Sequence, residues 1–357
     1  MSYPIEALDF QKDFPEFSRL FKVIYDGKEP CRSMYEWLFV KNVFNREGHF
    51  LHVAKDGAKV VASDCLLPVP VIINGNQYNA AWSIRTMTDP EYQRRGIFRA
   101  LTNHNIEAAR RQGIDLILGF ANNNSYPGYV KFGWEVLFER TASYRPLNLE
   151  KALTKKLRLP GLAKLANEGY RRYDHRKLQA NSHRHTGWFR FTNSTQAPPE
   201  TDSLWAKMHN FAPIMVARHH KYCDWRYNQR PNHKYKFITA YQGAEPAGLL
   251  IWRMLKNGSA LLVDYVGPRS KDLIVALANQ ALIQARNNGA NLMLESTGPY
   301  FRAELKTLGF RDLGRPLQNN HFIALRLNEK LDSKILGSEE NWFFSYGDSE
   351  FDLDAGF

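Results

Sequence analysis

The first part of the chain changes from helix-like to strand-like spacing of its apolar residues. Through about residue 45, apolar side chains recur at intervals of three and four, and Gly27 and Pro30 interrupt the pattern, which predicts two short helices. From His49 the spacing becomes that of strands, with turns at Asp56-Gly57 and Asn74-Gly75. We therefore expect an antiparallel meander with strands at residues 49–54, 60–71 and 78–88.

A helix and a buried strand follow this meander. Residues 96–112 carry an apolar stripe at helical spacing, and Gly113 ends the predicted helix. Residues 114–120 form a continuously apolar run, as expected of a parallel strand that is buried on both faces. A short helix and a closing strand complete the first half, at residues 126–132 and 134–144.

The second half of the chain repeats this order of elements. Two helical segments precede three strands, a long helix, a strand, a short helix and two final strands, at residues 203–211, 219–227, 235–241, 248–254, 259–266, 271–287, 291–295, 299–308, around Phe310 and 322–327. The segment 129–134 also matches the segment 305–310. We infer a tandem duplication of one αβ unit, so the predicted fold class is α/β, with two domains built on mixed α+β sheets.

Length and charge refine this picture. At 357 residues the chain exceeds the usual size of one hydrophobic core, which supports two domains. The net charge is +12, but residues 151–190 contribute eleven Lys or Arg against only Glu168 and Asp174. We therefore expect no nucleic-acid partner and interpret the positive charge as favouring an anionic substrate. A membrane-surface role for residues 151–172 is an alternative to a basic helix that lies on its own protein.

Composition also disfavours other classes of protein. The sequence has no run of about 18 apolar residues, and its start lacks the basic and apolar order of a signal peptide, so we expect no stable membrane insertion and a cytoplasmic location. Three widely spaced cysteines fit a reducing compartment, and the closely spaced histidines have no acidic or Cys partners at ligand spacing. We expect no metal site, and we leave a monomer and a homodimer open.

The segment most informative about chemistry is residues 86–101, which join a predicted strand to a predicted helix. Gly96 provides the turn and the helix begins at once, so several backbone N–H groups point outward at the positive end of the helix dipole. This arrangement favours phosphate binding. Arg94, Arg95 and Arg99 add positive charge around the loop, which therefore suits a pyrophosphate.

This segment resembles the signature of the GNAT acyltransferase superfamily, which reads Gln or Arg, any two residues, Gly, any residue, then Gly or Ala. Gln93 and Gly96 match it, whereas Arg94 stands where many members have glycine and Phe98 replaces the last small residue. The neighbouring elements and the stretch 129–134 agree with the family in order. The resemblance implies an acyl-CoA N-acyltransferase that uses acetyl-CoA or another short acyl-CoA and no metal.

In this family the strand before the loop separates from the next parallel strand, and the pantetheine arm of CoA pairs with the exposed edge. The resemblance therefore implies a set of residues that contact the co-substrate: Thr86, Met87, Thr88, Gln93, Arg94, Arg95, Gly96, Ile97, Phe98, Arg99, Asn122, Asn124 and Tyr126. The asparagines, which follow a predicted strand, are also compatible with a loop cap.

The implied chemistry is direct attack of a neutral amine on the thioester carbonyl, without a covalent enzyme intermediate. A backbone N–H near Met87 or Thr88 would act as the oxyanion donor, and Tyr129 resembles the proton-donating tyrosine of the family. The general base is left open among a chain of water molecules and five side chains, which are His321, Asp264, Glu295, Asp348 and Glu350.

The second half lacks the cofactor loop of the first. Its corresponding residues 266–272 have no Gln-x-x-Gly core and place Pro268 where an amide donor is needed, so we expect this half not to bind CoA but to shape the acceptor site. Aromatic and cationic residues there would suit a stacked base and a diphosphate, although core packing is as good an interpretation: Trp225, Arg226, Tyr227, Arg230, Tyr265 and Trp342.

The whole chain resembles two-domain GNAT proteins of bacterial surface-polysaccharide assembly through the segment 222–227, the nearby Pro231 and the tail 342–352. This resemblance implies a nucleotide-linked amino sugar as acceptor, for example a dTDP-linked aminodideoxyhexose. Alternatives are another small amine, a non-catalytic CoA-binding module and an aminoacyl-tRNA-dependent transferase. We divide the chain into an acyl-CoA-binding domain, a basic connector, a degenerate second domain and a tail, at residues 1–145, 146–200, 201–330 and 331–357.

Overall fold

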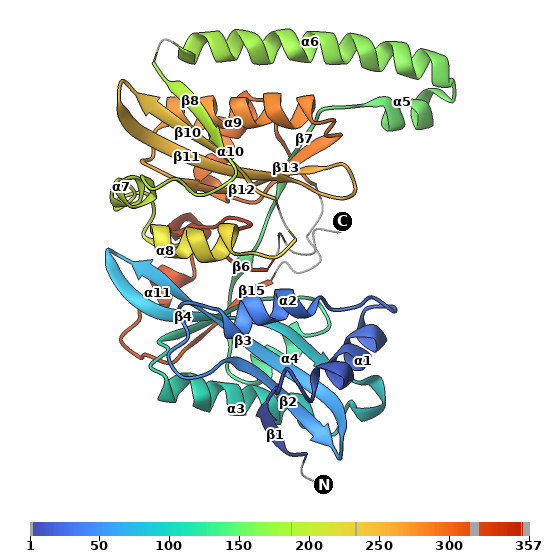
Figure 1. The fold of residues 1–357 in the computed structure, drawn as a ribbon, viewed down its shortest axis with the longest axis vertical. Coiled ribbons are helices and arrows are strands. Elements are labelled where there is room, and N and C mark those ends of the chain that lie inside the picture. Colours follow the sequence, from blue (N-terminus) through green and yellow to red (C-terminus); the bar gives the residue numbers. More distant parts are fainter. Residues whose placement is uncertain (1–2, 187, 233, 315–320, 351, 353–357) are drawn as a thin grey trace. The chain divides into compact units, whose positions relative to one another are not determined.

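The computed structural model, drawn as a ribbon in Figure 1, describes residues 3–186, 188–232, 234–314, 321–350 and 352. The chain forms two compact units that are interleaved in sequence. Unit 1 consists of Met1–Glu139, Gln229–Asn232 and Gln318–Ser338. Unit 2 consists of Arg140–Asn228, His233–Leu317 and Glu339–Phe357. Each unit contains a mixed sheet with helices packed on it, which confirms the predicted α/β class.

The two predicted short helices of unit 1 are α1 (Phe14–Ile24) and α2 (Arg32–Tyr35). The apolar stripe of α1 has helical spacing and packs on β3 and β4, because this contact buries its apolar side chains. Its buried residues are Phe17, Leu20 and Phe21. α2 continues into a π-helical turn at Glu36–Val40, which buries Trp37.

The strands of unit 1 lie in the order β1-β2-β3-β4-β5-β15-β6. β4 and β5 run parallel, and the other neighbours in this order run antiparallel, so the predicted meander is confirmed as β2, β3 and β4. The strands are β1 (Ile5–Ala7), β2 (Phe50–Asp56), β3 (Lys59–Ile73), β4 (Asn76–Thr88), β5 (Leu116–Ala121), β6 (Glu135–Glu139) and β15 (His321–Arg326). Further helices are α3 (Ile97–Arg111), α4 (Tyr126–Lys131) and α11 (Ser333–Leu336).

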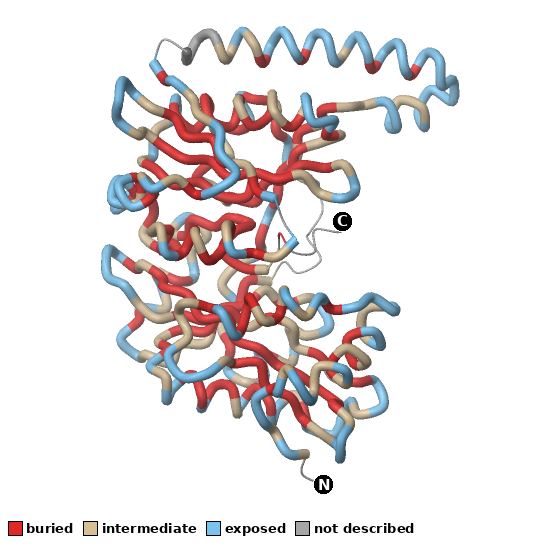
Figure 2. The backbone as a smooth tube through the Cα atoms, in the orientation of Figure 1, coloured by how far each residue is buried: buried red, intermediate tan, exposed pale blue. Residues whose placement is uncertain are grey.

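Both faces of the middle of this sheet are covered. Nearly every residue of β3 is buried, although alternate side chains point to opposite faces (Figure 2). α3 contacts β2 and β3, and Ile97 and Leu101 pack there against Ala54, Val61 and Ala62. The core of unit 1 therefore supports the strand that precedes the predicted phosphate loop and the helix that follows it.

Two strands are exchanged between the units, which corrects the predicted boundaries. β15 comes late in the sequence but pairs with β5 and β6 in unit 1. β7 (Ser143–Pro146) follows β6 in sequence but pairs with β13 (Leu292–Glu295) and β14 (Arg311–Asp312) in unit 2. The strand predicted at 134–144 is therefore two strands. A short apolar strand can complete any sheet edge that fits its side chains, so local spacing does not show which sheet it joins.

The strands of unit 2 lie in the order β14-β7-β13-β12-β11-β10-β8, with β12 and β13 parallel. The bounds of its remaining strands are β8 (Arg190–Ser194), β9 (Ile214–Val216), β10 (Lys236–Gln242), β11 (Glu245–Met254), β12 (Ala260–Val266) and β16 (Trp342–Phe343). Its helices are α5 (Glu150–Leu157), α6 (Pro160–Thr186), α7 (Thr201–Ala206), α8 (His220–Cys223), α9 (Lys271–Asn287) and α10 (Pro299–Thr307).

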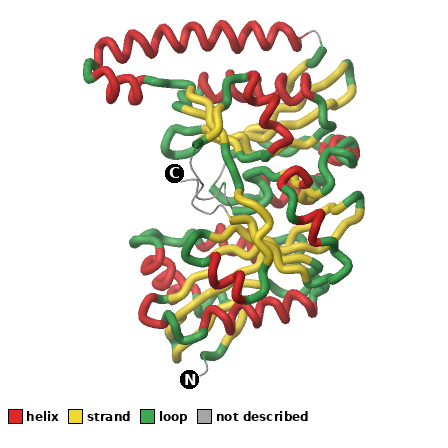
Figure 3. Tube along the Cα trace, turned by 180° about the vertical axis from the view of Figure 1, so that it is seen from behind, coloured by secondary structure: helices red, strands yellow, loops and turns green. Residues whose placement is uncertain are grey.

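The two units repeat one plan, as the duplication predicted. In each, a parallel strand pair is followed by a strand from the other half of the sequence and then by an outer strand, in the orders β4-β5-β15-β6 and β12-β13-β7-β14. α8 continues into a π-helical turn at Asp224–Asn228 that buries Trp225, as α2 does with Trp37. Figure 3 shows the two sets of strands in yellow, each accompanied by helices in red.

The predicted basic connector contains the helices α5 and α6, which agrees with the interpretation of a basic helix that lies on its own protein. α5 and α6 contact each other, and α6 packs on α9 of unit 2. α6 is the longest of these helices, but within the part of the chain that the structure describes no helix combines the length and hydropathy needed to cross a membrane.

Candidate functional site

The two parallel strands of unit 1 separate before the predicted loop. β4 and β5 pair as far as Ser83 and Gly119, after which β4 continues to Thr88 with β3 as its partner among the described strands. Residues 86–88 therefore lie beyond the pairing with β5, and no described strand pairs with them on that side. An edge of this kind can accept an extended ligand as an additional strand.

A β-bulge shapes this edge. Arg85 and Thr86 together lie opposite the single residue Asp64 of β3, and Arg85 adopts a φ of +55°. Bulges next to functional sites re-aim side chains. Here the Thr86 hydroxyl donates to the Asp64 carboxylate at 2.7 Å.

The register of β4 shows which backbone N–H groups face the open edge. The Asp89 N–H donates to Val61 of β3 at 2.9 Å. Because successive residues of a strand point their backbone groups to opposite sides, the N–H and C=O of Thr88 face away from β3, and those of Met87 face toward it. The Gln93 side chain reaches the outward C=O of Thr88 at 3.5 Å. Of the two predicted oxyanion donors, the geometry therefore favours Thr88 and disfavours Met87.

The loop after β4 turns directly into the helix α3. A 3₁₀ turn at Pro90–Tyr92 leads to Gly96, whose φ of +78° is natural for glycine, and α3 begins at the next residue. The first bond of this helix runs from the Ala100 N–H to the Gly96 carbonyl. The N–H groups at positions 97–99 precede that bond and are oriented outward, at the positive end of the α3 dipole.

The three loop arginines have different surroundings. The Arg95 guanidinium donates to the Tyr3 hydroxyl at 3.1 Å and to the Glu91 carbonyl at 2.8 Å, so it is held by the protein itself. Arg94 is exposed with a φ of +62°. Arg99 is also exposed, over the ring of Phe132. Arg94 and Arg99 are therefore better placed than Arg95 to meet an anionic ligand.

Tyr129 of α4 points its hydroxyl at β4. The hydroxyl lies 3.2 Å from the Ser83 hydroxyl and 3.0 Å from the Thr86 hydroxyl, on the two sides of the bulge. Burial raises the pKa of Tyr129 well above its usual value, so the phenol keeps its proton at neutral pH. Phe98, which departs from the family signature, packs edge-on against the Tyr129 ring.

The space for the Phe98 ring comes from Gly128. A Cβ atom at Gly128 would lie 2.9 Å from the Phe98 ring. The large residue in the loop is thus matched by the absence of a side chain on α4, which explains how this chain tolerates the departure.

A buried polar chain continues from Tyr129 beneath α3. The Asn105 amide donates to Asp64 at 3.0 Å, and its oxygen lies 2.6 Å from His52 Nδ1. Burial raises the pKa of Asp64, which faces two neutral donors there, and lowers the pKa of His52 to about 4. His52 is therefore neutral at pH 7 and donates through Nδ1 to Asn105. The whole chain of groups runs through His52, Asn105, Asp64, Thr86 and Tyr129.

Sequence reasoning missed Asp64, although a signal was present. Asp64 is the one acidic residue of β3, whose residues after Lys59 are otherwise apolar or small, and His52 lies directly opposite it on β2. A charged residue at the centre of a buried strand is costly unless it is hydrogen-bonded, so it is more often kept for a role than by chance.

The structure also brings two predicted residues, His321 and Tyr126, together with Asn123 at the end of β5. His321 Nε2 lies 2.9 Å from the Asn123 side-chain oxygen, and its ring stacks on Tyr126 with a centroid distance of 4.6 Å. His321 was assigned to the second half, but β15 places it in unit 1. Asn122 instead caps its own loop by accepting from the Asn124 and Ser125 N–H groups, as the alternative interpretation expected.

In unit 2 the place of the open edge is taken by the chain itself. β12 pairs with β13 only as far as Leu261 in the described register, and beyond that point Val263 accepts from the N–H of Gly347 in the C-terminal tail. The tail residues around Gly347 are buried, and β16 pairs with β9. This filling supports the prediction that the second half does not bind CoA.

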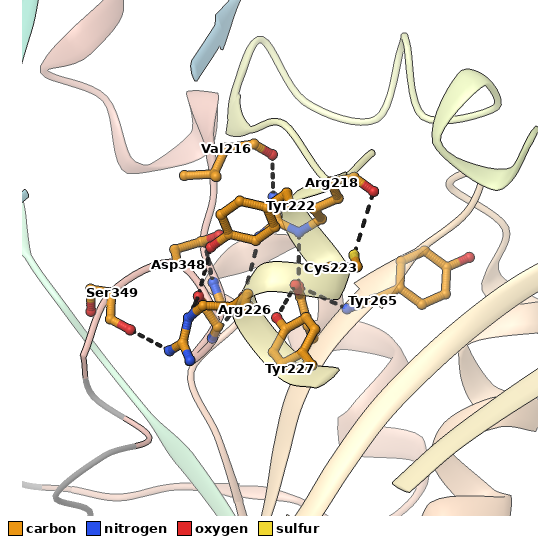
Figure 4. A network of polar contacts seen from close by, with 12 residues as sticks. Val216, Arg218, Tyr222, Cys223, Arg226, Tyr227, Tyr265, Asp348 and Ser349 are labelled. Carbon is orange, nitrogen blue, oxygen red and sulfur yellow. Dashed lines mark hydrogen bonds and ion pairs between the residues drawn. The ribbon is translucent and has the colours of Figure 1, made fainter. Parts of the chain in front are cut away.

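Asp348, a predicted base, belongs to a buried ion network of unit 2 (Figure 4). Arg218 donates to Asp348 at 2.5 Å and to Asp264 at 2.8 Å. Burial raises the pKa of Asp348, and the Asp264 carboxylate that shares the guanidinium adds to this rise. Glu295 is likewise buried and accepts from Ser143 and Thr297. These carboxylates are engaged inside unit 2, so the structure disfavours them as bases.

The six residues predicted to bind the acceptor are all in the interior. Arg226 donates to the Gly347 and Ser349 carbonyls and to Asp352, and the Tyr227 hydroxyl donates to Asp264 at 2.6 Å. Ligand contact would require these bonds to break, so the core-packing interpretation fits better. The buried side chains are Trp225, Arg226, Tyr227, Arg230, Tyr265 and Trp342.

Comparisons with known proteins agree with the geometry of unit 1. Residues 9–137 match the family model described as an acetyltransferase (GNAT) domain, a segment that contains the loop, Asp64 and Tyr129. No curated protein has a significant match to the sequence.

Several solved structures share the fold at low sequence identity. A conserved protein from Enterococcus faecalis, titled a probable N-acyltransferase, has 13% identity and a TM-score of 0.62, over 92% of this chain and 73% of its own. A tandem GNAT protein from the clavulanic acid biosynthesis pathway has 13% identity and a TM-score of 0.55, over 93% and 100%. N-myristoyltransferase from Saccharomyces cerevisiae, with bound myristoyl-CoA, has 10% identity and a TM-score of 0.60, over 91% and 82%.

The family match and the fold agree on the class of domain that unit 1 contains. Residues 9–137 are similar to GNAT acetyltransferase domains. The whole chain shares the two-domain fold of the tandem GNAT and N-myristoyltransferase structures. Among the described residues no group of three or more His, Cys, Asp or Glu could hold a metal ion.

Proposed function

We propose that unit 1 binds acyl-CoA along the open edge of β4 and transfers the acyl group directly to an amine. The observation that carries this proposal is the Tyr129 hydroxyl, which lies at the bulge where β4 runs past the end of its pairing with β5. The pantetheine arm would pair with residues 86–88, and the pyrophosphate would meet the N–H groups at 97–99.

Each part of the chemistry has a candidate group. The amine nitrogen attacks the thioester carbon, and the Thr88 N–H stabilises the resulting oxyanion. When the C–S bond breaks, Tyr129 gives its proton to the sulfur, which leaves as the CoA thiol. The proton of the ammonium passes to His321, the one predicted base that unit 1 contains, or to water.

Asp64 has a positioning role in this scheme. Asp64 accepts the hydrogen of the Thr86 hydroxyl, so the Thr86 oxygen is left to accept from the Tyr129 hydroxyl and holds the phenol in place. After the transfer to sulfur, the Tyr129 phenolate recovers a proton from water. Burial raises the pKa of Asp64, and the hydrogen bonds from Asn105 and Thr86 oppose this rise.

Asp64→Asn tests this role, because asparagine keeps the shape of the side chain but accepts more weakly than a carboxylate. Asn105 can turn its amide to face the new side chain, since His52 can change tautomer. We expect kcat to fall about tenfold while the KM for acyl-CoA changes little, because the Thr86 oxygen would no longer be held as an acceptor for Tyr129. Asp115→Asn, which changes a structural carboxylate elsewhere in unit 1, should leave kcat unchanged. An Asp64→Asn enzyme with the wild-type kcat would show that Asp64 does not position Tyr129.

For the acceptor, we propose the amino group of a nucleotide-linked amino sugar, such as a dTDP-linked aminodideoxyhexose. The support is the net charge of +12, which attracts a diphosphate and repels polyamines or aminoglycosides. The buried aromatic residues of unit 2 give no support for it, so the acceptor pocket is built from other residues.

The proposed function is tested by release of the CoA thiol in the presence of acyl-CoAs of different chain length and a panel of amines. We expect turnover with acetyl-CoA or another short acyl-CoA and an anionic amino sugar. Turnover only with cationic amines would replace the acceptor class, and turnover lost after nuclease treatment would indicate aminoacyl-tRNA. Binding of acyl-CoA without turnover of any amine would favour a CoA-binding module.

A further inference from the structure

The long helix α6 packs on its own protein along one side, but the leucines near its start are exposed. Its inward face makes polar contacts: Asn167 accepts from the Leu149 N–H at 2.7 Å, and the Tyr170 hydroxyl donates to the Pro146 carbonyl at 2.8 Å. Further along, Asp174 accepts from Arg145 at 2.5 Å. These bonds fix which side of α6 faces unit 2.

Leucines are exposed at the start of this helix and just before it. Arg158 ends α5 with a φ of +56°, which reverses the chain, and α6 begins at Pro160. Around that reversal four leucines are exposed, namely Leu157 at 42%, Leu159 at 56%, Leu162 at 55% and Leu165 at 68%. Exposed apolar side chains gathered within nine positions mark a contact surface more often than scattered ones do.

The same segment is strongly basic. No acidic residue occurs from 151 to 167, and five exposed cations surround the leucines: Lys151, Lys155, Lys156, Arg158 and Lys164. We call residues 151–165 the α5–α6 corner. Figures 1 and 2 show it at the free end of α6, mostly pale blue, beyond the sheet of unit 2.

We propose that the α5–α6 corner docks unit 2 on the surface of a membrane that contains anionic phospholipids. The cations would lie at the level of the phosphates, and the leucines would enter the boundary between headgroups and acyl chains. Lysine and arginine stems allow this, because they keep their charges in the polar layer while their methylenes follow the apolar boundary.

A lipid surface explains the composition of the corner better than a soluble polyanion does. A nucleic acid or an acidic protein segment would be held by the cations and would gain little from four protruding leucines. The docking is peripheral, because no described helix could cross a bilayer. It does not depend on the proposed acyl transfer, since the corner lies in unit 2 and the candidate site in unit 1.

The test is flotation of the full chain with vesicles of phosphatidylcholine alone or of phosphatidylcholine mixed with phosphatidylglycerol. We expect the protein to float with the mixed vesicles and not with phosphatidylcholine alone. The charge-preserving variant Leu159→Gln/Leu162→Gln/Leu165→Gln should lose at least tenfold in partitioning, and Lys155→Gln/Lys156→Gln/Arg158→Gln should lose as much.

Two matched controls separate the corner from general surface effects. Val23→Gln/Val40→Gln removes exposed apolar side chains of unit 1, and Lys28→Gln/Lys41→Gln/Lys330→Gln removes the same number of charges there. Both should float like the wild type, and all variants should unfold at the wild-type temperature. The lipid proposal would be overturned if the triple-leucine variant floated like the wild type and both proteins bound heparin equally well. That result would favour a soluble polyanion as the partner. Absence of flotation with the mixed vesicles would also overturn the lipid proposal.

Discussion

Replacement of Tyr129 by phenylalanine is expected to lower kcat at least a hundredfold while the Kd for acetyl-CoA changes little. The phenol is the acid that we assign to the leaving sulfur, and general acid catalysis typically contributes a factor of about 10²–10⁴. Phenylalanine fills the same space against Phe98 and Trp134, so the packing of α4 is retained. Steady-state kinetics together with calorimetric titration of acetyl-CoA would separate the chemical step from binding.

The matched control is Tyr126→Phe. Tyr126 lies one turn earlier on α4 and stacks on His321, a contact that phenylalanine can also make. We expect this variant to retain at least a third of the wild-type kcat. If the Tyr129→Phe enzyme were as active as the control, the proton would reach the sulfur from another group, and the assignment of Tyr129 would be wrong.

Replacement of Gly96 by valine is expected to weaken acyl-CoA binding at least a hundredfold, about 2.7 kcal/mol. The φ of +78° at Gly96 is strained for a β-branched residue, so the loop would change shape. A side chain there would also occupy the space beside the N–H groups that we assign to the pyrophosphate. Titration with CoA itself measures this loss without any assumption about the acceptor.

Gly75 offers a control with the same backbone geometry. It also has a φ of +78°, and a Cβ atom would meet no neighbour within 4 Å at either glycine. Gly75→Val thus imposes similar strain on the hairpin between β3 and β4, away from the loop. We expect it to bind CoA like the wild type, provided that both variants remain folded by circular dichroism. Unchanged CoA affinity in Gly96→Val would refute the phosphate assignment.

Much of unit 1 could be predicted because its signals are local. The Asn74-Gly75 turn, the apolar run of β5 and the Gly96 turn before α3 each constrain the backbone within a few residues. The position of Tyr129 on α4 followed from the resemblance, and the structure then placed its hydroxyl at β4.

The remaining features depend on contacts between distant parts of the sequence. The exchange of β7 and β15 is decided by which sheet edge is available, and neither strand carries a local mark of its partner. The role of Asp64 appears only when the bulge brings Thr86 opposite it. Arg226 and Trp225 were predicted to bind the acceptor, but both are buried. Aromatic and cationic residues suit ligand recognition and a buried polar network equally well, so the sequence does not distinguish the two.

The most direct test of the account is a calorimetric titration of the wild-type chain with acetyl-CoA. One open strand edge, in unit 1, and one edge filled by the tail, in unit 2, predict a single site per chain. Binding should also raise the unfolding temperature, since the ligand binds only the native state. A stoichiometry of two would show that unit 2 retains a cofactor site, and no binding at all would contradict the assignment of the β4 edge and its loop to acyl-CoA.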